Sequence, residues 1–128
     1  MPFTPTNPFV WIEMPVTDMD RAMAFYSKVF GYDFEVDTSG PNPMAMFTPK
    51  DVQTGTAGHL YPGKPAAKGT GMSAHMEIPD DLDAAKARVI EAGGTIELDG
   101  HVVEIPAGSF AYATDPDGNS IGLFQPKR

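Results

Sequence analysis

The sequence contains an internal repeat, and this feature most constrains its fold. Residues 18–31 (DMDRAMAFYSKVFG) align without a gap on residues 81–94 (DLDAAKARVIEAGG). The identical positions are Asp18/Asp81, Asp20/Asp83, Ala22/Ala85, Ala24/Ala87 and Gly31/Gly94. Each copy follows a strand-like run, at 9–16 and 73–78, and precedes further strand-like runs. The repeat therefore predicts two similar modules that meet around an approximate two-fold axis, with a binding site where they meet.

Composition limits the classes of function. The chain has 128 residues, enough for one domain that buries roughly two-thirds of its unfolded surface. Its net charge is −8 and its nine Lys and Arg residues are scattered, which argues against a nucleic-acid partner. The absence of Cys excludes disulfides and thiolate chemistry. No run approaches the roughly 20 apolar residues of a membrane helix, and no signal peptide is evident, so we expect a cytoplasmic protein without a membrane partner.

The first copy has the pattern of a strand followed by a helix. Residues alternate in polarity over 9–16, as in a half-buried strand. Thr17 or Asp18 can cap the helix, and Gly31 suits its C-terminal end. Phe25 and Tyr26 lie on a helix that carries an apolar stripe, and both are expected to pack in the core. Further strands are predicted at 32–36, 44–47 and 56–61.

The second copy repeats this order. Asp80 or Asp81 can cap a helix that closes at 93–94. Strands are predicted at 95–98, 101–105, 109–114 and 119–124, with a turn at 115–118. We expect a single domain over 1–128, built of βαβββ modules at 8–62 and 71–125 and joined by a Pro- and Gly-rich linker at 62–71.

The register of the second module depends on one residue. Suppose that the second module has one more residue between strand and helix than the first module, namely Pro79. Met76 and Ile78 then face the core. His75 and Glu77 then point to the opposite face of the strand.

These motifs resemble a known superfamily. Residues 15–31 are similar to the first-module signature of the vicinal oxygen chelate superfamily, which contains glyoxalase I, the bleomycin-resistance proteins and the extradiol dioxygenases. Residues 81–85, 91–94, 108–111 and 115–123 are similar to its second-module signature. The resemblance covers residues 8–125. It implies an α+β fold in which two paired βαβββ modules, each a curved sheet backed by a helix, form a cleft for a small molecule. In the family's enzymes that cleft holds a divalent metal, bound by the first and last strands of both modules.

The metal positions implied by the resemblance can be compared with the residues present. They fall at Trp11, His59, Ser73 and Gly122. Only His59 is a competent ligand for a divalent ion, so no metal is expected at these positions. Trp11 can instead form an apolar or stacking wall for a ligand, or pack in the core.

Other polar residues are expected in the same cleft. Glu13, His59, His75 and Glu77 could form a displaced cluster that suits Zn, Ni, Mn or Fe, or a metal-free acid–base pair. Alternatively, they line a metal-free polar pocket that binds water or ligand. The expected ligand-binding cleft comprises Trp11, Glu13, His59, Ser73, His75, Glu77 and Gly122; no catalytic residue is assigned.

Three functions follow from this interpretation. The first is a small-molecule-binding protein of the glyoxalase/bleomycin-resistance type. The second is a metal-dependent lyase, isomerase or dioxygenase that uses the displaced cluster. The third is a resistance protein whose acidic cleft sequesters a cationic antibiotic. A homodimer is expected in each case, because exposed sheet edges commonly pair with another chain.

Overall fold

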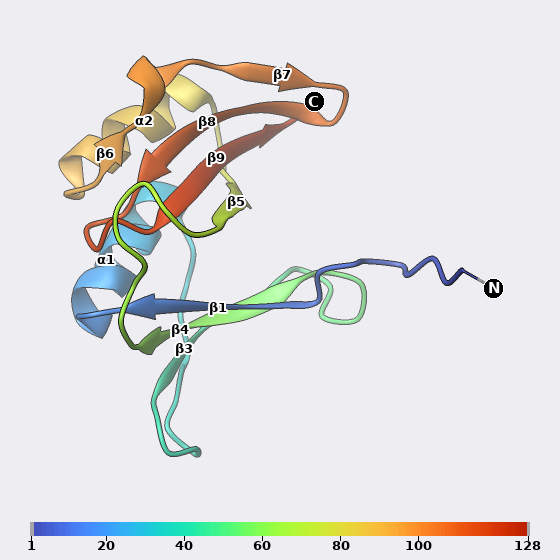
Figure 1. Cartoon of the computed structure of the whole chain (residues 1–128), viewed down its shortest axis with the longest axis vertical. Coiled ribbons are helices and arrows are strands. Elements are labelled where there is room, and N and C mark those ends of the chain that lie inside the picture. Colours follow the sequence, from blue (N-terminus) through green and yellow to red (C-terminus); the bar gives the residue numbers. More distant parts are fainter. Residues whose placement is uncertain (1, 128) are drawn as a thin grey trace.

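The structure, a computed structural model, describes residues 2–127 and contains two β-sheets with two helices beside them (Figure 1). The first sheet has the strand order β1-β4-β3-β2, in which β1 runs parallel to β4 and the other pairs are antiparallel. Its module, the first module, consists of β1 (Trp11–Val16), α1 (Met19–Phe30), β2 (Val36–Asp37), β3 (Met44–Phe47) and β4 (Ala57–Pro62).

The second sheet has the strand order β5-β9-β8-β6, and β6 and β7 pair with the two ends of one edge of β8. The second module consists of β5 (Ser73–Glu77), α2 (Leu82–Glu91), β6 (Thr95–Ile96), the 3-10 helix η1 (Leu98–Gly100), β7 (Val103–Ile105), β8 (Gly108–Thr114) and β9 (Ser120–Pro126). Strand β5 runs parallel to β9, as β1 does to β4. The predicted α+β fold with two helix-backed sheets is confirmed.

Capping side chains mark the start of both helices, and a glycine marks the end of α1. The carboxylate of Asp18 accepts a hydrogen bond from the Arg21 amide at 3.0 Å, and Asp81 accepts one from the Ala84 amide at 2.8 Å. Gly31 ends α1 with φ 75°, a left-handed conformation that glycine adopts without steric cost. These caps were predicted. Among residues 2–127, no helix is long and apolar enough to cross a membrane.

One hydrophobic core joins the two modules. Phe25 and Tyr26 of α1 are fully buried in it, as predicted. In the second module Ile78 is fully buried and Met76 packs against the core, whereas His75 and Glu77 are exposed. The predicted register of β5 is therefore confirmed.

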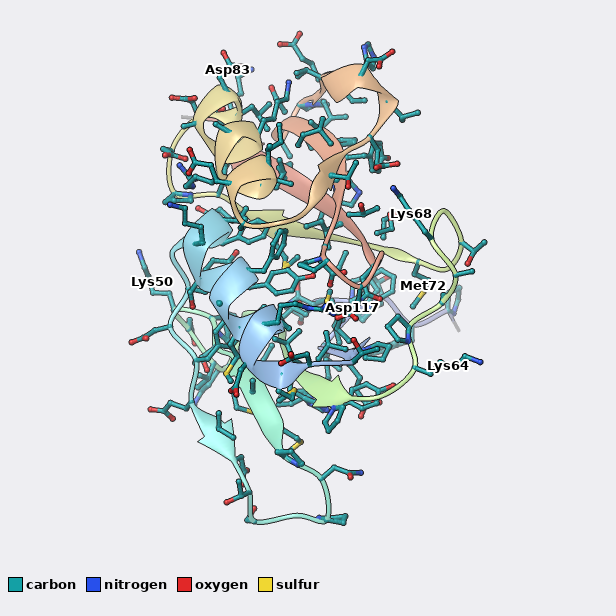
Figure 2. All side chains as sticks on the ribbon, turned by 90° about the vertical axis from the view of Figure 1, so that its left-hand side faces the viewer. Lys50, Lys64, Lys68, Met72, Asp83 and Asp117 are labelled. Atoms are coloured by element: carbon teal, nitrogen blue, oxygen red, sulfur yellow. The ribbon has the colours of Figure 1, made fainter. Side chains whose placement is uncertain are left out.

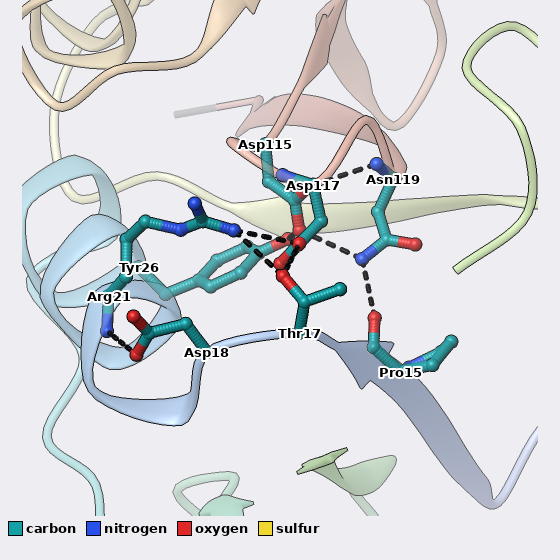
Figure 3. A network of polar contacts seen from close by, with 8 residues as sticks. All are labelled: Pro15, Thr17, Asp18, Arg21, Tyr26, Asp115, Asp117 and Asn119. Atoms are coloured by element: carbon teal, nitrogen blue, oxygen red, sulfur yellow. Dashed lines mark hydrogen bonds and ion pairs between the residues drawn. The ribbon is translucent and has the colours of Figure 1, made fainter. Parts of the chain in front are cut away.

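A polar network fixes the first module to the turn between β8 and β9 (Figure 3). Asp115, only 3% exposed, accepts hydrogen bonds from the Tyr26 hydroxyl at 2.8 Å and from the Asn119 side chain at 3.0 Å. The Asn119 amide group also donates to the carbonyl of Pro15 at the end of β1, at 2.8 Å. Arg21 of α1 forms an ion pair with Asp117 at 2.8 Å. The predicted turn thus also connects the modules.

A hydrogen bond also connects the two helices to each other. Arg88 of α2 donates from Nε to the carbonyl of Val29 in α1 at 2.9 Å. Its two terminal nitrogens form a bidentate pair with Asp80 at 2.7 and 2.8 Å, which holds the guanidinium in that orientation.

The structure corrects several predicted strand boundaries; for example, β7 begins at Val103 rather than at residue 101. Strand β1 begins at Trp11 rather than at residue 9. Of the strand predicted at 32–36, only Val36 belongs to β2, because the preceding segment packs its aromatic rings against Phe30 and Phe47 instead of joining the ladder. The strand predicted at 95–98 stops at Ile96, since Leu98 and Asp99 have left-handed φ values of 51° and 53°.

We predict that Tyr26→Phe lowers the free energy of unfolding by about 1–3 kcal/mol, because the buried Asp115 carboxylate loses a donor. Burial, reinforced by Asp115, raises the pKa of Tyr26 well above its ordinary value. This contribution is therefore complete below the unfolded phenol pKa of about 10 and is lost as the pH rises beyond it. Urea unfolding at pH 7 and above pH 10 measures both effects.

The matched control is Tyr112→Phe, which removes a hydroxyl that makes no hydrogen bond within residues 2–127 and should change stability by less than about 0.5 kcal/mol. Equal losses in the two variants would contradict a special role for the Asp115 network.

Candidate functional site

A cleft runs between β1 and β5, the strands at the facing edges of the two sheets. Its larger cavity, about 760 Å³, is lined by β1 and by His75 and Glu77 on β5. Its smaller cavity, about 530 Å³, is lined by Glu13 on β1 and by Ser73 and His75 on β5. The two cavities share Ile12, Met14, Thr56, Ala74 and His75. The cleft is thus continuous and bounded by both modules.

The two ends of the cleft differ. Lys50 lines the larger cavity and Met72 the smaller one, and Figure 2 places these residues at opposite sides of the molecule. The larger cavity also carries the carboxylates of Asp33, Glu35 and Glu77. None of these three forms an ion pair within residues 2–127, so this end has an excess of negative charge over Lys50.

A cluster of rings occupies the first sheet beside the cleft. The Trp11 indole Nε1 donates to Nδ1 of His59 at 2.9 Å. Nε2 of His59 lies 3.6 Å from the Glu13 carboxylate, and the Tyr61 ring packs edge-on at 5.9 Å. His59 is only 6% exposed, whereas Trp11 is 47% exposed. The pairing of β1 with β4 produces this contact by placing Glu13 opposite His59.

A second cluster occupies the corresponding face of the second sheet. The His75 imidazole packs against the rings of Phe110 and Tyr112, at centroid distances of 4.7 and 5.4 Å. It lies over Gly122, where an added Cβ would overlap its ring atoms. Partial burial lowers the pKa of His75 below its ordinary value, because removal of water disfavours the charged ring.

The predicted site residues thus divide into two sets. Glu13, Ser73, His75 and Glu77 line the cleft cavities. The remaining three, Trp11, His59 and Gly122, belong to the ring clusters on the sheet faces and line neither cavity.

The residues at the implied metal positions do not fit a divalent ion. An indole nitrogen can only donate, so Nδ1 of His59 must be the acceptor, and the one lone pair of the neutral imidazole is used by Trp11. Gly122 has no side chain, and the hydroxyl of Ser73 contacts that of Ser120.

The displaced cluster does not form either. Within residues 2–127, no three His, Asp or Glu side chains are close enough together to hold one ion. The physical reason is the cleft itself: Glu13 and His59 belong to the first sheet, His75 and Glu77 to the second, and no ladder joins β1 to β5.

Several residues at the site were not predicted. Phe110 and Tyr112 alternate with the buried Ala111 and Ala113 along β8, and this period of two could have identified them as one face of a strand. Asp33 and Glu35 carried no such signal.

We predict that Gly122→Ala displaces the His75 ring, because the new methyl group must occupy its place. The imidazole proton resonances should leave the ring-current field of Phe110 and Tyr112. The apparent pKa of His75 should rise towards the ordinary value, because a displaced ring is better hydrated. Proton NMR titration measures both. Gly40→Ala, where an added Cβ meets no atom within 4 Å, is the control. Unchanged His75 resonances in Gly122→Ala would contradict this geometry.

Sequence comparison relates the chain to named proteins. The profile of the Glyoxalase/Bleomycin resistance protein/Dioxygenase superfamily matches residues 9–123. A glyoxylase-like domain-containing protein of Didymella fabae is 31% identical over 128 residues, covering 88% of each chain. The Mycobacterium tuberculosis protein CFP32, named as a glyoxylase, is 28% identical over 120 residues, which are 92% of this chain and 45% of that protein. The chain therefore spans less than half the length of CFP32.

Solved structures show the same fold. A glyoxalase/bleomycin resistance protein from Albidiferax ferrireducens has a TM-score of 0.71 at 20% identity, covering 94% of this chain and 100% of that one. TnmS3, an antibiotic binding protein from Streptomyces sp. CB03234, has a TM-score of 0.61 at 30% identity, covering 94% and 97%. Profile, relatives and fold agree: this chain belongs to the glyoxalase/bleomycin resistance protein/dioxygenase superfamily.

Proposed function

We propose that this chain binds a small molecule at the cleft between its modules and holds it without a resident divalent metal. The main support for this proposal is the hydrogen bond from Trp11 to His59. It occupies the lone pair of the His59 imidazole that a metal ion would need. Trp11, Tyr61, Phe110 and Tyr112 leave aromatic surface on sheet faces beside the cleft. Such surfaces suit a largely apolar ligand, which the cleft residues Glu13, His75 and Glu77 would orient by polar contacts.

A second candidate is sequestration of an antibiotic. TnmS3 is described as an antibiotic binding protein, and its 30% identity to this chain over nearly the full length favours a related role. The unpaired carboxylates of Asp33, Glu35 and Glu77 in the larger cavity would favour a cationic compound. In this role the protein would release the compound chemically intact.

We further propose that the chain acts in the cytoplasm as a homodimer. Ile105 of β7, the strand at the margin of the second sheet, is 43% exposed. A second copy would remove such surface from water. Light scattering should give twice the mass of the chain, and a monomer would contradict the proposal.

We predict that protein purified without a His-tag contains far less than one Zn, Ni, Mn or Fe ion per chain by elemental analysis.

In a thermal-shift screen, a ligand at about 100 times its Kd should stabilise the native state by about 2.7 kcal/mol. For a chain of this size, that corresponds to a rise in Tm of roughly 10 °C.

The variants Glu35→Gln and Glu77→Gln separate the two candidates, because they should weaken a cationic antibiotic more than a neutral compound. A stoichiometric metal that is lost in His59→Ala or His75→Ala would contradict the metal-free proposal and support the metal-dependent enzyme.

A further inference from the structure

Trp11 combines a large accessible surface with a fixed orientation. Its side chain is 47% exposed, on the face of β1 opposite the buried Met14 and Val16. An exposed side chain commonly exchanges rotamers on the picosecond to nanosecond timescale. Here the indole Nε1 is tied to Nδ1 of His59 at 2.9 Å, so the ring has a defined plane before any ligand arrives.

His59 can keep accepting this hydrogen bond because burial and a neighbouring ring fix the orientation of its imidazole. It is 6% exposed and lies against Tyr61. Since Nδ1 accepts from Trp11, the proton of the neutral imidazole is on Nε2, and Nε2 faces the Glu13 carboxylate at 3.6 Å. Glu13 therefore favours the one tautomer of His59 that can accept from Trp11.

We propose that His59 is a positioning residue, which fixes the Trp11 indole, next to Phe9 and Glu13 at the rim of the smaller cavity, as a rigid stacking surface for a planar aromatic ring of a ligand that extends out of the cleft. This inference rests on the proposed function, because it names the class of molecule that the site would take. Flat aromatic groups stack favourably on an indole face. A side chain that is already ordered does not lose further freedom when the ligand binds, which strengthens binding.

The same contacts separate this role from others that a histidine can have. A general base needs an accessible lone pair, and the lone pair of His59 is turned towards Trp11 in a buried position. His59 thus acts on the ligand through Trp11.

The test uses the fact that Trp11 is the only tryptophan of the chain. The time-resolved fluorescence anisotropy of the untagged full chain reports the mobility of this one ring. Binding of the neutral dye N-phenyl-1-naphthylamine, whose naphthalene ring system is planar, is measured by quenching of Trp11 and by the emission of the dye. The variants are His59→Phe, which keeps a ring but cannot accept a hydrogen bond, and His59→Gln, whose side-chain carbonyl can accept one. His101→Ala, which alters an exposed histidine in a loop, is the control.

In wild-type protein we expect slow anisotropy decay and dye binding. His59→Phe should add a fast decay component and weaken the dye roughly three- to tenfold, as expected when a side chain must be ordered on binding. His59→Gln should restore both properties to within about threefold of wild type, and His101→Ala should leave both unchanged. The Tm of each variant is measured, so that a loss of folding is recognised separately.

The inference is wrong if His59→Phe folds with unchanged anisotropy decay and unchanged dye affinity. It is equally wrong if the dye binds with the same affinity in Trp11→Leu. Failure of wild type to bind the dye, while other compounds raise its Tm, would contradict the stacking role and leave the small-molecule-binding function standing. Failure of every compound in the thermal-shift screen would instead contradict the proposed function itself.

Discussion

Asp115 is buried between the two modules, and its carboxylate is fully hydrogen-bonded there. One oxygen accepts from the amides of Asp117 and Asn119, and the other accepts from Tyr26 of α1 and from the Asn119 side chain. A buried charge is tolerated only when its partners stay in place, so this network favours one arrangement of the modules. No strand ladder joins β1 to β5, and the separation of the sheets therefore depends on side-chain contacts such as these.

The cleft is a direct consequence of this arrangement. The edges of β1 and β5 face each other without pairing, and Ile12, Met14, Ala74 and His75 line the space between them. The Asn119 contact to Pro15 and the hydrogen bond from Tyr32 to the Glu77 carbonyl, at 2.6 Å, span the modules near the ends of these two strands. Changes at those contacts would alter both the width of the cleft and its lining, because Tyr32 lines the larger cavity and Asn119 the smaller one.

Much of the fold could be predicted from the sequence, because it follows from local chemistry. The repeat with its caps at Asp18 and Asp81 specified both helices, and the alternation at Met76 and Ile78 specified the register of β5. The segment at 32–35 could not be assigned correctly, because its conformation depends on ring packing with Phe30 and with Phe47, and Phe47 belongs to another strand.

The candidate site was less predictable, because it too depends on contacts between residues that are far apart in the sequence. The sequence indicated that Trp11, Ser73 and Gly122 are poor ligands, but it could not show that Trp11 donates to His59 or that His75 lies over Gly122. Both contacts depend on the pairing of neighbouring strands, β1 with β4 and β5 with β9. Glu13 and Glu77 were assigned to one cluster because strand alternation gives the face of a residue but not its distance across the cleft.

The indole of Trp11 occupies the lone pair of His59, the one histidine at the implied metal positions. Long-range proton–nitrogen correlation NMR of nitrogen-15-labelled, untagged protein at neutral pH measures this most directly, because it distinguishes a protonated ring nitrogen from an unprotonated one. We expect His59 to carry its proton on Nε2, with Nδ1 accepting the hydrogen bond from Trp11. A proton on Nδ1, or a metal-shifted Nε2 resonance, would contradict it.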